Sequence, residues 1–401
     1  MAAEWLPTTE QTARLSSLDA CRGFAMLLLA SGSYTLFREG FGLQEVASHF
    51  PENEIWRFVG TQFSHSAWRG ITVWDLVMPL FIFMVGVAMS YSYAKRKRQG
   101  QAFRQMAAHA AYRAAVFIVL GSIGFIVLGN LVMMRLPNHL NIDFSNVLPQ
   151  IGLAYFFAFL LVGRSVRLQL GVSLGILFIY WLAFALYPSD SIGPPKSDQF
   201  GGFYAHWNRG ANVAVDVDRW LLNALPRTDP YVAHAAGMQT LNFIPTISTI
   251  IFGVMAGDYL RRAVNAPRTA RFLVGVGIGA VIVGLAMDAT VCPLVKALWT
   301  PSWAILSSGC ALMILAWFYW IVDGKGYRRW AFPFIVVGAN SLVAYSLANL
   351  ADYWVFKAWE RVVGKTLFVD PYGPVWKSLG LVVFVWFACF ALYRREMFVR
   401  I

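Results

Sequence analysis

Residues 64–98 read SHSAWRGITVWDLVMPLFIFMVGVAMSYSYAKRKR, and this stretch decides the fold class. It begins with a histidine near a tryptophan and an arginine, continues through a mostly apolar run of about twenty residues, and ends in four consecutive basic residues. An apolar run that ends in a basic cluster predicts a transmembrane helix whose C-terminal end faces the cytoplasm. His65 is then expected at the opposite mouth of the helix. Asp75 lies within the apolar run, where an ionisable group is costly and usually functional.

The composition of the whole chain is that of a polytopic membrane protein. Of the 401 residues, 58% are hydrophobic and 13% are charged. The net charge of +12 comes from short basic clusters between apolar runs, which membrane topology explains better than nucleic-acid binding does. No cleavable signal peptide is expected, because the chain starts with a polar segment and the first apolar run lacks an early cleavage site. The cysteines and histidines show no metal-like spacing, so no metal site is predicted.

The apolar runs predict an all-α, polytopic membrane helical bundle of about ten transmembrane helices. With the N-terminus inside, the basic residues fall on the cytoplasmic side and most acids on the other, which predicts cytoplasmic positions for both termini. The chain is expected to form one domain over residues 1–401, in a cell inner (plasma) membrane. Two long extracytoplasmic loops, about 38–70 and 188–238, are of the length typical of functional lids, binding loops or disordered segments. The runs lie near residues 17–37, 71–93, 114–134, 147–163, 168–187, 239–257, 271–290, 302–322, 333–350 and 375–393.

Two pairs of residues in this pattern suggest chemistry. His65 is able to act as a general base or as a nucleophile that carries an acyl group. Asp75 lies ten residues further on, or ~15 Å of rise in a continuous helix. A direct hydrogen bond to His65 is therefore not expected, and Asp75 is interpreted as a ligand-facing acid or a packing anchor. Asp19 and Arg22 share a helix face at the cytoplasmic entrance, either as an ordinary ion pair or with Arg22 meeting a phosphate-bearing ligand.

Several blocks of the sequence resemble one known family. RLSSLDACRGFAMLLL looks like its opening helix, and HSAWRGITVWDLVMPLFIFMVGVAMS is similar to its signature stretch. TLNFIPTISTIIFGVMAGDYLR, PLVKALWTPSWAILSSGCALMILAWFYWIVD and PFIVVGANSLVAYSL resemble later blocks, in the same order. The chain resembles the heparan-α-glucosaminide N-acetyltransferase family of transmembrane acyltransferases, including its bacterial members.

The resemblance implies an acetyl-CoA-dependent N- or O-acetyltransferase. It would pass the acetyl group from cytoplasmic acetyl-CoA, its co-substrate, to an amine or hydroxyl of a sugar or amino-sugar acceptor on the far side of the lipid bilayer. It implies that His65 is catalytic. Asp75 and Ser33 are the expected catalytic neighbours. The resemblance leaves open whether the protein forms a homodimer. The other expected residues are Asp19, Arg22, Arg113, Asn340 and Ser341 for acetyl-CoA, and Trp68, Arg69, Lys296 and Trp299 for the acceptor.

The chain also departs from the family pattern. Ser33 stands where the animal enzyme has an asparagine that is taken to assist the histidine, and a hydroxyl lacks the two donors of an amide. Gln150 stands where an arginine is common, and Arg69 replaces an asparagine. These changes leave the acceptor and the CoA contacts open. A transporter or flippase for a sugar or lipid-linked sugar is the alternative function, because it explains polar groups inside the spans equally well.

Overall fold

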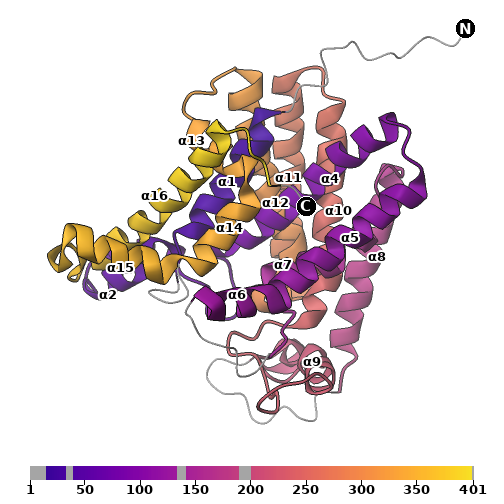
Figure 1. Cartoon of the computed structure of the whole chain (residues 1–401). Coiled ribbons are helices and arrows are strands. Elements are labelled where there is room, and N and C mark those ends of the chain that lie inside the picture. The colour runs from indigo at the N-terminus through magenta and orange to yellow at the C-terminus, as the bar shows by residue number, and fades with distance from the viewer. Residues whose placement is uncertain (1–14, 33–38, 133–140, 189–199, 400–401) are drawn as a thin grey trace, which may run out of the picture.

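The computed structural model describes residues 15–32, 39–132, 141–188 and 200–399, and every regular element in these ranges is a helix. Figure 1 shows the helices as one bundle, with the short helix α9 at one end. The α-helices are α1 (Ser16–Ala30), α2 (Leu43–Ser48), α3 (Glu54–Gln62), α4 (Val77–Arg98), α5 (Phe103–Val119), α6 (Phe125–Val132), α7 (Val147–Phe159), α8 (Val166–Ala185), α9 (Val213–Asn223), α10 (Phe243–Arg261), α11 (Ala266–Thr290), α12 (Pro301–Phe318), α13 (Phe332–Ala339), α14 (Ser341–Leu350), α15 (Asp352–Val363) and α16 (Gly373–Arg394). The predicted all-α membrane bundle is confirmed.

Seven stretches among the described residues are long and apolar enough to cross a membrane. They are Trp74–Arg98, Phe103–Asn130, Val166–Ala185, Thr240–Arg261, Ala266–Thr290, Pro301–Gly324 and Gly373–Arg394. Helices α13 and α14 make an eighth if the pair, bent by 84°, is one span. The runs expected near 17–37 and 147–163 correspond to α1 and α7, whose described lengths of 15 and 13 residues are below the ~20 residues of an average span. The count of about ten and the cytoplasmic termini stay predictions.

Helices α4 and α10 form the buried centre of the bundle and approach each other at glycines. A Cβ atom on Gly86 would lie 1.9 Å from the carbonyl oxygen of Ile250, and one on Gly253 would lie 2.1 Å from that of Phe83. Helices α1 and α13 meet in the same way, since a Cβ on Gly23 would lie 1.8 Å from the oxygen of Phe334. Small residues let membrane helices pack backbone against backbone.

The glycine run of α11 uses only its middle member for such packing. A Cβ on Gly277 would lie 2.8 Å from the carbonyl oxygen of Gly309 on α12, whereas one on Gly275 or Gly279 would meet no heavy atom within 4 Å. One face of α11 is therefore close-packed against α12, and the face that carries Gly275 and Gly279 does not contact other helices at these two positions.

The two long loops are partly helical and meet each other at one end of the bundle. Residues 39–70 contain α2 and α3, and residues 200–238 contain the 3₁₀ helix η5 (Gly202–Trp207) and α9. The indole of Trp68 donates a hydrogen bond to the carbonyl oxygen of Trp207 at 3.0 Å, which joins one loop to the other. Residues 33–38 and 189–199, within or next to these loops, lie outside the described part of the chain.

We expect Gly86→Ala to lower the stability of the protein, because the added methyl group overlaps the backbone of α10. Overpacking of this kind typically costs about 1–3 kcal/mol of unfolding free energy. Gly275→Ala is the matched control, since it adds the same methyl group to open space on α11. Thermal unfolding in detergent measures both variants. An equal melting temperature for the two would contradict the packing that the structure shows.

Candidate active site

The carboxylate of Asp75 is the centre of a polar cluster at the start of α4. The residue is fully buried, in the 3₁₀ turn η3 (Trp74–Leu76) that precedes the helix. His65 Nδ1 lies 2.8 Å from Asp75 Oδ1, and the ammonium of Lys296 donates to the same oxygen at 3.0 Å. The backbone N–H of Ser66 donates to Oδ2 at 3.1 Å. Both oxygens of the buried anion are therefore satisfied, as a charge in this position requires.

The expectation that helical rise would keep His65 and Asp75 apart is wrong, because the chain between them is not helical. Gly70 has φ 123°, a conformation that only glycine adopts readily. The hydroxyl of Thr72 accepts the N–H of Asp75 at 3.2 Å and donates to the carbonyl oxygen of Ser64 at 2.7 Å. A threonine hydroxyl that accepts an N–H three residues later is a helix cap. The helix begins after this cap, and the preceding loop folds back to place His65 beside Asp75.

An ion pair fastens the loop of His65 to the end of α11. The guanidinium of Arg69 donates from Nε and Nη2 to the two carboxylate oxygens of Asp288, at 2.9 and 3.1 Å. The N–H of Gly70 donates to the carbonyl oxygen of Leu294 at 3.0 Å. Two-point contacts between Arg and a carboxylate fix orientation as well as distance. The loop on which His65 lies is thus held at three consecutive positions, since Trp68 is buried and bonded to the second long loop.

Lys296 reaches the cluster from a short turn between α11 and α12. The turn is η7 (Lys296–Leu298), and the next residue, Trp299, has φ 46°. The hydroxyl of Thr300 accepts the N–H of Val295 at 3.1 Å and donates to the carbonyl oxygen of Pro293 at 2.8 Å, which closes the turn. Trp299 is fully buried and donates from Nε1 to Thr249. The turn therefore presents the lysine to Asp75 while its tryptophan anchors in the core.

The surroundings of His65 favour its neutral form, chiefly through burial. Burial lowers the pKa of His65, the hydrogen bond to Asp75 opposes this, and the charge of Lys296 lowers it further. Burial also lowers the pKa of Lys296, against the attraction of Asp75 and Glu39. The carboxylate of Glu39 accepts the backbone N–H of His65 at 3.1 Å. Burial raises the pKa of Glu39 to about 7, although the bond from His65 lowers it.

This arrangement distinguishes the two nitrogens of the His65 ring. Nδ1 faces Asp75 Oδ1 and lies 2.9 Å from the Lys296 ammonium. Nε2 makes no hydrogen bond with any residue of the described ranges, and half of the side chain is exposed. The carboxylate of Asp75 can only accept, so its contact with Nδ1 puts the ring proton on Nδ1 and the lone pair of the neutral imidazole on Nε2. The ammonium of Lys296 can only donate, so it bonds Asp75 and not the ring. The site can therefore take a proton, or form a bond, at Nε2.

The residues expected for acetyl-CoA lie apart from this cluster. Arg22 donates to Asp19 at 2.5 Å within α1, as their spacing predicted. The guanidinium of Arg113 on α5 lies 5.1 Å above the ring of Tyr155. Asn340 lies at the bend between α13 and α14, where its amide binds Met397 and Val399 near the C-terminus. Ser341 is the first residue of α14, and Ser33 lies outside the described residues.

Several residues of the cluster were not anticipated. Glu39 is 26 positions from His65, and no local spacing links the two. Thr72 carried a usable signal, because a threonine three residues before an acid is a common pattern at helix starts. Asp288, near the end of α11, holds Arg69 and also accepts the N–H of Leu294 at 2.7 Å. Within the described ranges no three His, Cys, Asp or Glu side chains come together in a way that would hold a metal ion.

We expect Lys296→Met to raise the pH at which His65 titrates. The change removes a positive charge next to Nδ1 and leaves the Asp75 charge less compensated, and both effects favour the imidazolium. The pH dependence of His65 modification by diethyl pyrocarbonate, read by mass spectrometry, measures the titration. Lys357→Met is the control, because that ammonium pairs with Glu360 on α15. An unchanged titration in Lys296→Met would show that the ammonium does not act on His65.

Comparison with known proteins gives two relatives of the same name. No family model matches the chain. Heparan-alpha-glucosaminide N-acetyltransferase of Mus musculus is 26% identical over 388 residues, covering 86% of this chain and 55% of the mouse protein. The Homo sapiens protein of that name is 27% identical over 377 residues, covering 83% and 52%. The chain thus spans about half the length of the curated relatives it matches. These matches confirm the resemblance to the heparan-α-glucosaminide N-acetyltransferases that the sequence motifs predicted.

Proposed function

We propose that the protein is a membrane acyltransferase that moves an acetyl group from acetyl-CoA to an amine or hydroxyl of a sugar-type acceptor. The observation that carries the proposal is the pairing of His65 Nδ1 with a buried carboxylate at 2.8 Å, which leaves Nε2 open. A histidine oriented by a carboxylate through one nitrogen is the arrangement that acyl-transfer enzymes use for base catalysis. The names of the two relatives support the choice of acetyl group and amino sugar.

In direct transfer, Nε2 of His65 takes the proton from the acceptor as its nitrogen or oxygen attacks the thioester carbonyl carbon. The new C–N or C–O bond forms, the C–S bond breaks, and the CoA sulfur leaves with the electron pair and then receives the proton from Nε2. Asp75 keeps the ring in the required tautomer and stabilises the imidazolium that forms.

In the two-step route, Nε2 itself attacks the thioester carbonyl carbon, the C–S bond breaks, and CoA leaves as the thiolate. The acceptor then attacks the acetyl carbon of the acetyl-imidazole, the C–Nε2 bond breaks with its electron pair returning to Nε2, and the proton of the acceptor neutralises the thiolate. The loop geometry allows both routes, since each uses the same nitrogen.

The donor and the acceptor are proposed to approach from opposite ends of α4. The basic end of α4 would face the cytoplasm of an inner-membrane protein, and Arg113 is the best-placed contact for CoA phosphates there. Its buried Nε has no hydrogen-bond partner in the described part of the chain, and a guanidinium matches phosphate geometry. Arg22 and Ser341 are kept as further contacts. Trp68 and Arg69 lie on the loop of His65, so we assign them to the wall of the acceptor site, while Lys296 is assigned to the His65 cluster.

We expect His65→Ala to abolish acetyl transfer from acetyl-CoA to glucosamine while acetyl-CoA still binds. The variant removes the group that accepts the proton but leaves the basic end of α4 untouched. Loss of general base catalysis alone costs about 10²–10⁴-fold in rate. Product formation by mass spectrometry and binding by thermal shift measure the two effects. His49→Ala is the control, because that exposed side chain lies 3.9 Å from Asp370 and away from the cluster. Transfer at the wild-type rate by His65→Ala would overturn the proposal.

The two routes differ in what acetyl-CoA alone produces. We expect protein incubated with acetyl-CoA and no acceptor to carry an acetyl group on His65 if the two-step route operates, and none if transfer is direct. Peptide mapping after an acid-free quench reads the modification. Asp75→Asn should lower the rate of turnover in both routes, because both need the same tautomer of His65. In the two-step route it should lower the amount of acetylated His65 by a comparable factor. A variant with full turnover would contradict the role given to Asp75.

A further inference from the structure

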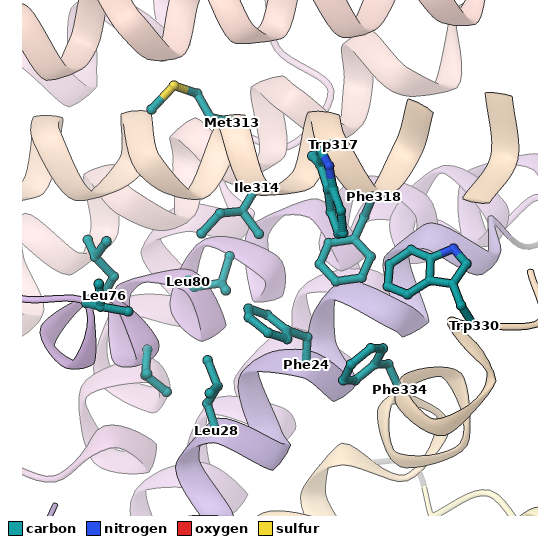
Figure 2. Close-up of a pocket in the computed structure, with 12 residues that line it drawn as sticks. Phe24, Leu28, Leu76, Leu80, Met313, Ile314, Trp317, Phe318, Trp330 and Phe334 are labelled. Atoms are coloured by element: carbon teal, nitrogen blue, oxygen red, sulfur yellow. The ribbon is translucent and has the colours of Figure 1, made fainter. Parts of the chain in front are cut away.

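An apolar pocket lies at the start of α4, on the face opposite the His65 cluster. Its cavity volume is about 520 Å³, within the range of about 300–1,000 Å³ that holds small-molecule ligands. Figure 2 shows Leu76 and Trp330 at its two ends, with Phe24, Leu28 and Ile314 between them. The walls come from α1, the start of α4, α12 and α13. The only polar atoms among these lining side chains are the indole nitrogens of two tryptophans.

The pocket is not part of the acyl-transfer site. Val73, Leu76, Val77 and Leu80 line it, and this spacing places them on one face of the helix start. Asp75 points away from that face, toward His65 and Lys296. A ligand in the pocket would therefore lie across α4 from the reacting nitrogen.

The pocket opens to the surface that the bilayer covers. Two of the helices that line it are candidate membrane spans, and its rim residues Val73, Trp317 and Trp330 are 48%, 48% and 38% exposed. Water gains nothing in a cavity without polar partners. Hydrocarbon is the matching occupant, because the walls and the surrounding medium are both apolar.

The Trp330 end of the pocket adjoins a basic segment. Lys325, Arg328 and Arg329 lie in the connection from the π-helical turn η8 (Tyr319–Gly324) to α13. The nearby acid, Asp323, is occupied by the N–H groups of Ser16 and Ser17 at the start of α1. Its distance to Arg328 is 4.0 Å, and 65% of the Arg328 side chain is exposed. Two guanidinium groups are thus available for an anion beside the apolar pocket.

We propose that this pocket binds one acyl chain of an anionic phospholipid whose phosphate meets Arg328 and Arg329. Basic pockets between transmembrane helices are recognised sites for anionic head groups. Trp330, which packs on Phe318 with ring centroids 5.7 Å apart, lies between chain and head group. Tryptophan suits this position because one side of its ring is apolar and its N–H prefers the interface. The proposal is independent of the acetyl-transfer activity.

The test measures which lipid the full chain retains. The protein is exchanged from detergent into nanodiscs of phosphatidylcholine with or without phosphatidylglycerol, and native mass spectrometry counts the lipid that stays bound after release. We expect wild-type protein to retain phosphatidylglycerol in preference to phosphatidylcholine. Arg328→Gln with Arg329→Gln should lower that retention about twenty-five-fold, since each basic group near an anionic head group contributes roughly five-fold. Ile314→Trp, which fills the pocket, should lower it as well.

Two control variants separate this site from general attraction. Lys97→Gln with Arg98→Gln removes two charges at the end of α4, and Ile282→Trp adds an indole to an exposed position of α11. Neither should reduce retention. Equal losses of retention in the two double variants would overturn the proposal. Equal retention of the two lipids by wild-type protein, or binding of glycerol phosphate alone as tight as that of the whole lipid, would overturn it as well. A contact between two chains at Trp317 would overturn it too, since a second copy would then cover the pocket. The double variant changes surface side chains only, so the test holds even if Ile314→Trp does not fold.

Discussion

The buried carboxylate of Asp75 is the constraint on which the site depends. An isolated carboxylate inside a membrane bundle would cost several kcal/mol. The cost is offset by donors from two distant segments, the loop of His65 and Ser66 and the turn of Lys296. Each donor is needed because the residue is fully buried, and a lost partner would leave part of the anion unsatisfied. The carboxylate therefore dictates where both segments lie.

The charges of the cluster are balanced for a change at His65. With neutral His65, the ammonium of Lys296 compensates Asp75, while Glu39 has a pKa raised to about 7 by burial and sits on the His65 backbone. When the imidazole gains a proton, the charge of Asp75, whose Oδ1 lies 2.8 Å from Nδ1, compensates it. Fixed counter-charges of this kind stabilise a developing charge without reorganisation. The ring of His65 thus lies between a negative and a positive side chain, Asp75 and Lys296.

The lengths of the apolar runs and the basic clusters were enough to predict the class of the fold. The thickness of the bilayer sets the first, and the orientation of helices in the membrane sets the second. His65, Asp75 and Lys296 were each singled out from sequence, but their contact was not. The rise argument assumed a helix through residues 65–75, and the Thr72 cap and Gly70 break it. Lys296 is 231 positions from His65, and Glu39 has no motif. Contacts of that separation depend on how α4, α11 and α12 pack, which periodicity does not report. The 84° bend at Asn340 was missed for the same reason.

The placement of the cluster follows from where the helices are interrupted. Backbone that leaves helical geometry within a membrane bundle must find hydrogen-bond partners inside the protein. Asp288 supplies one for Leu294, Thr300 for Val295, and Thr72 for Asp75. Asp288 also holds Arg69, and Thr300 closes the turn that presents Lys296. The same side chains that stabilise the irregular backbone therefore position the histidine and the lysine. The stability of the irregular backbone and the geometry of the cluster are therefore coupled, because the same side chains serve both.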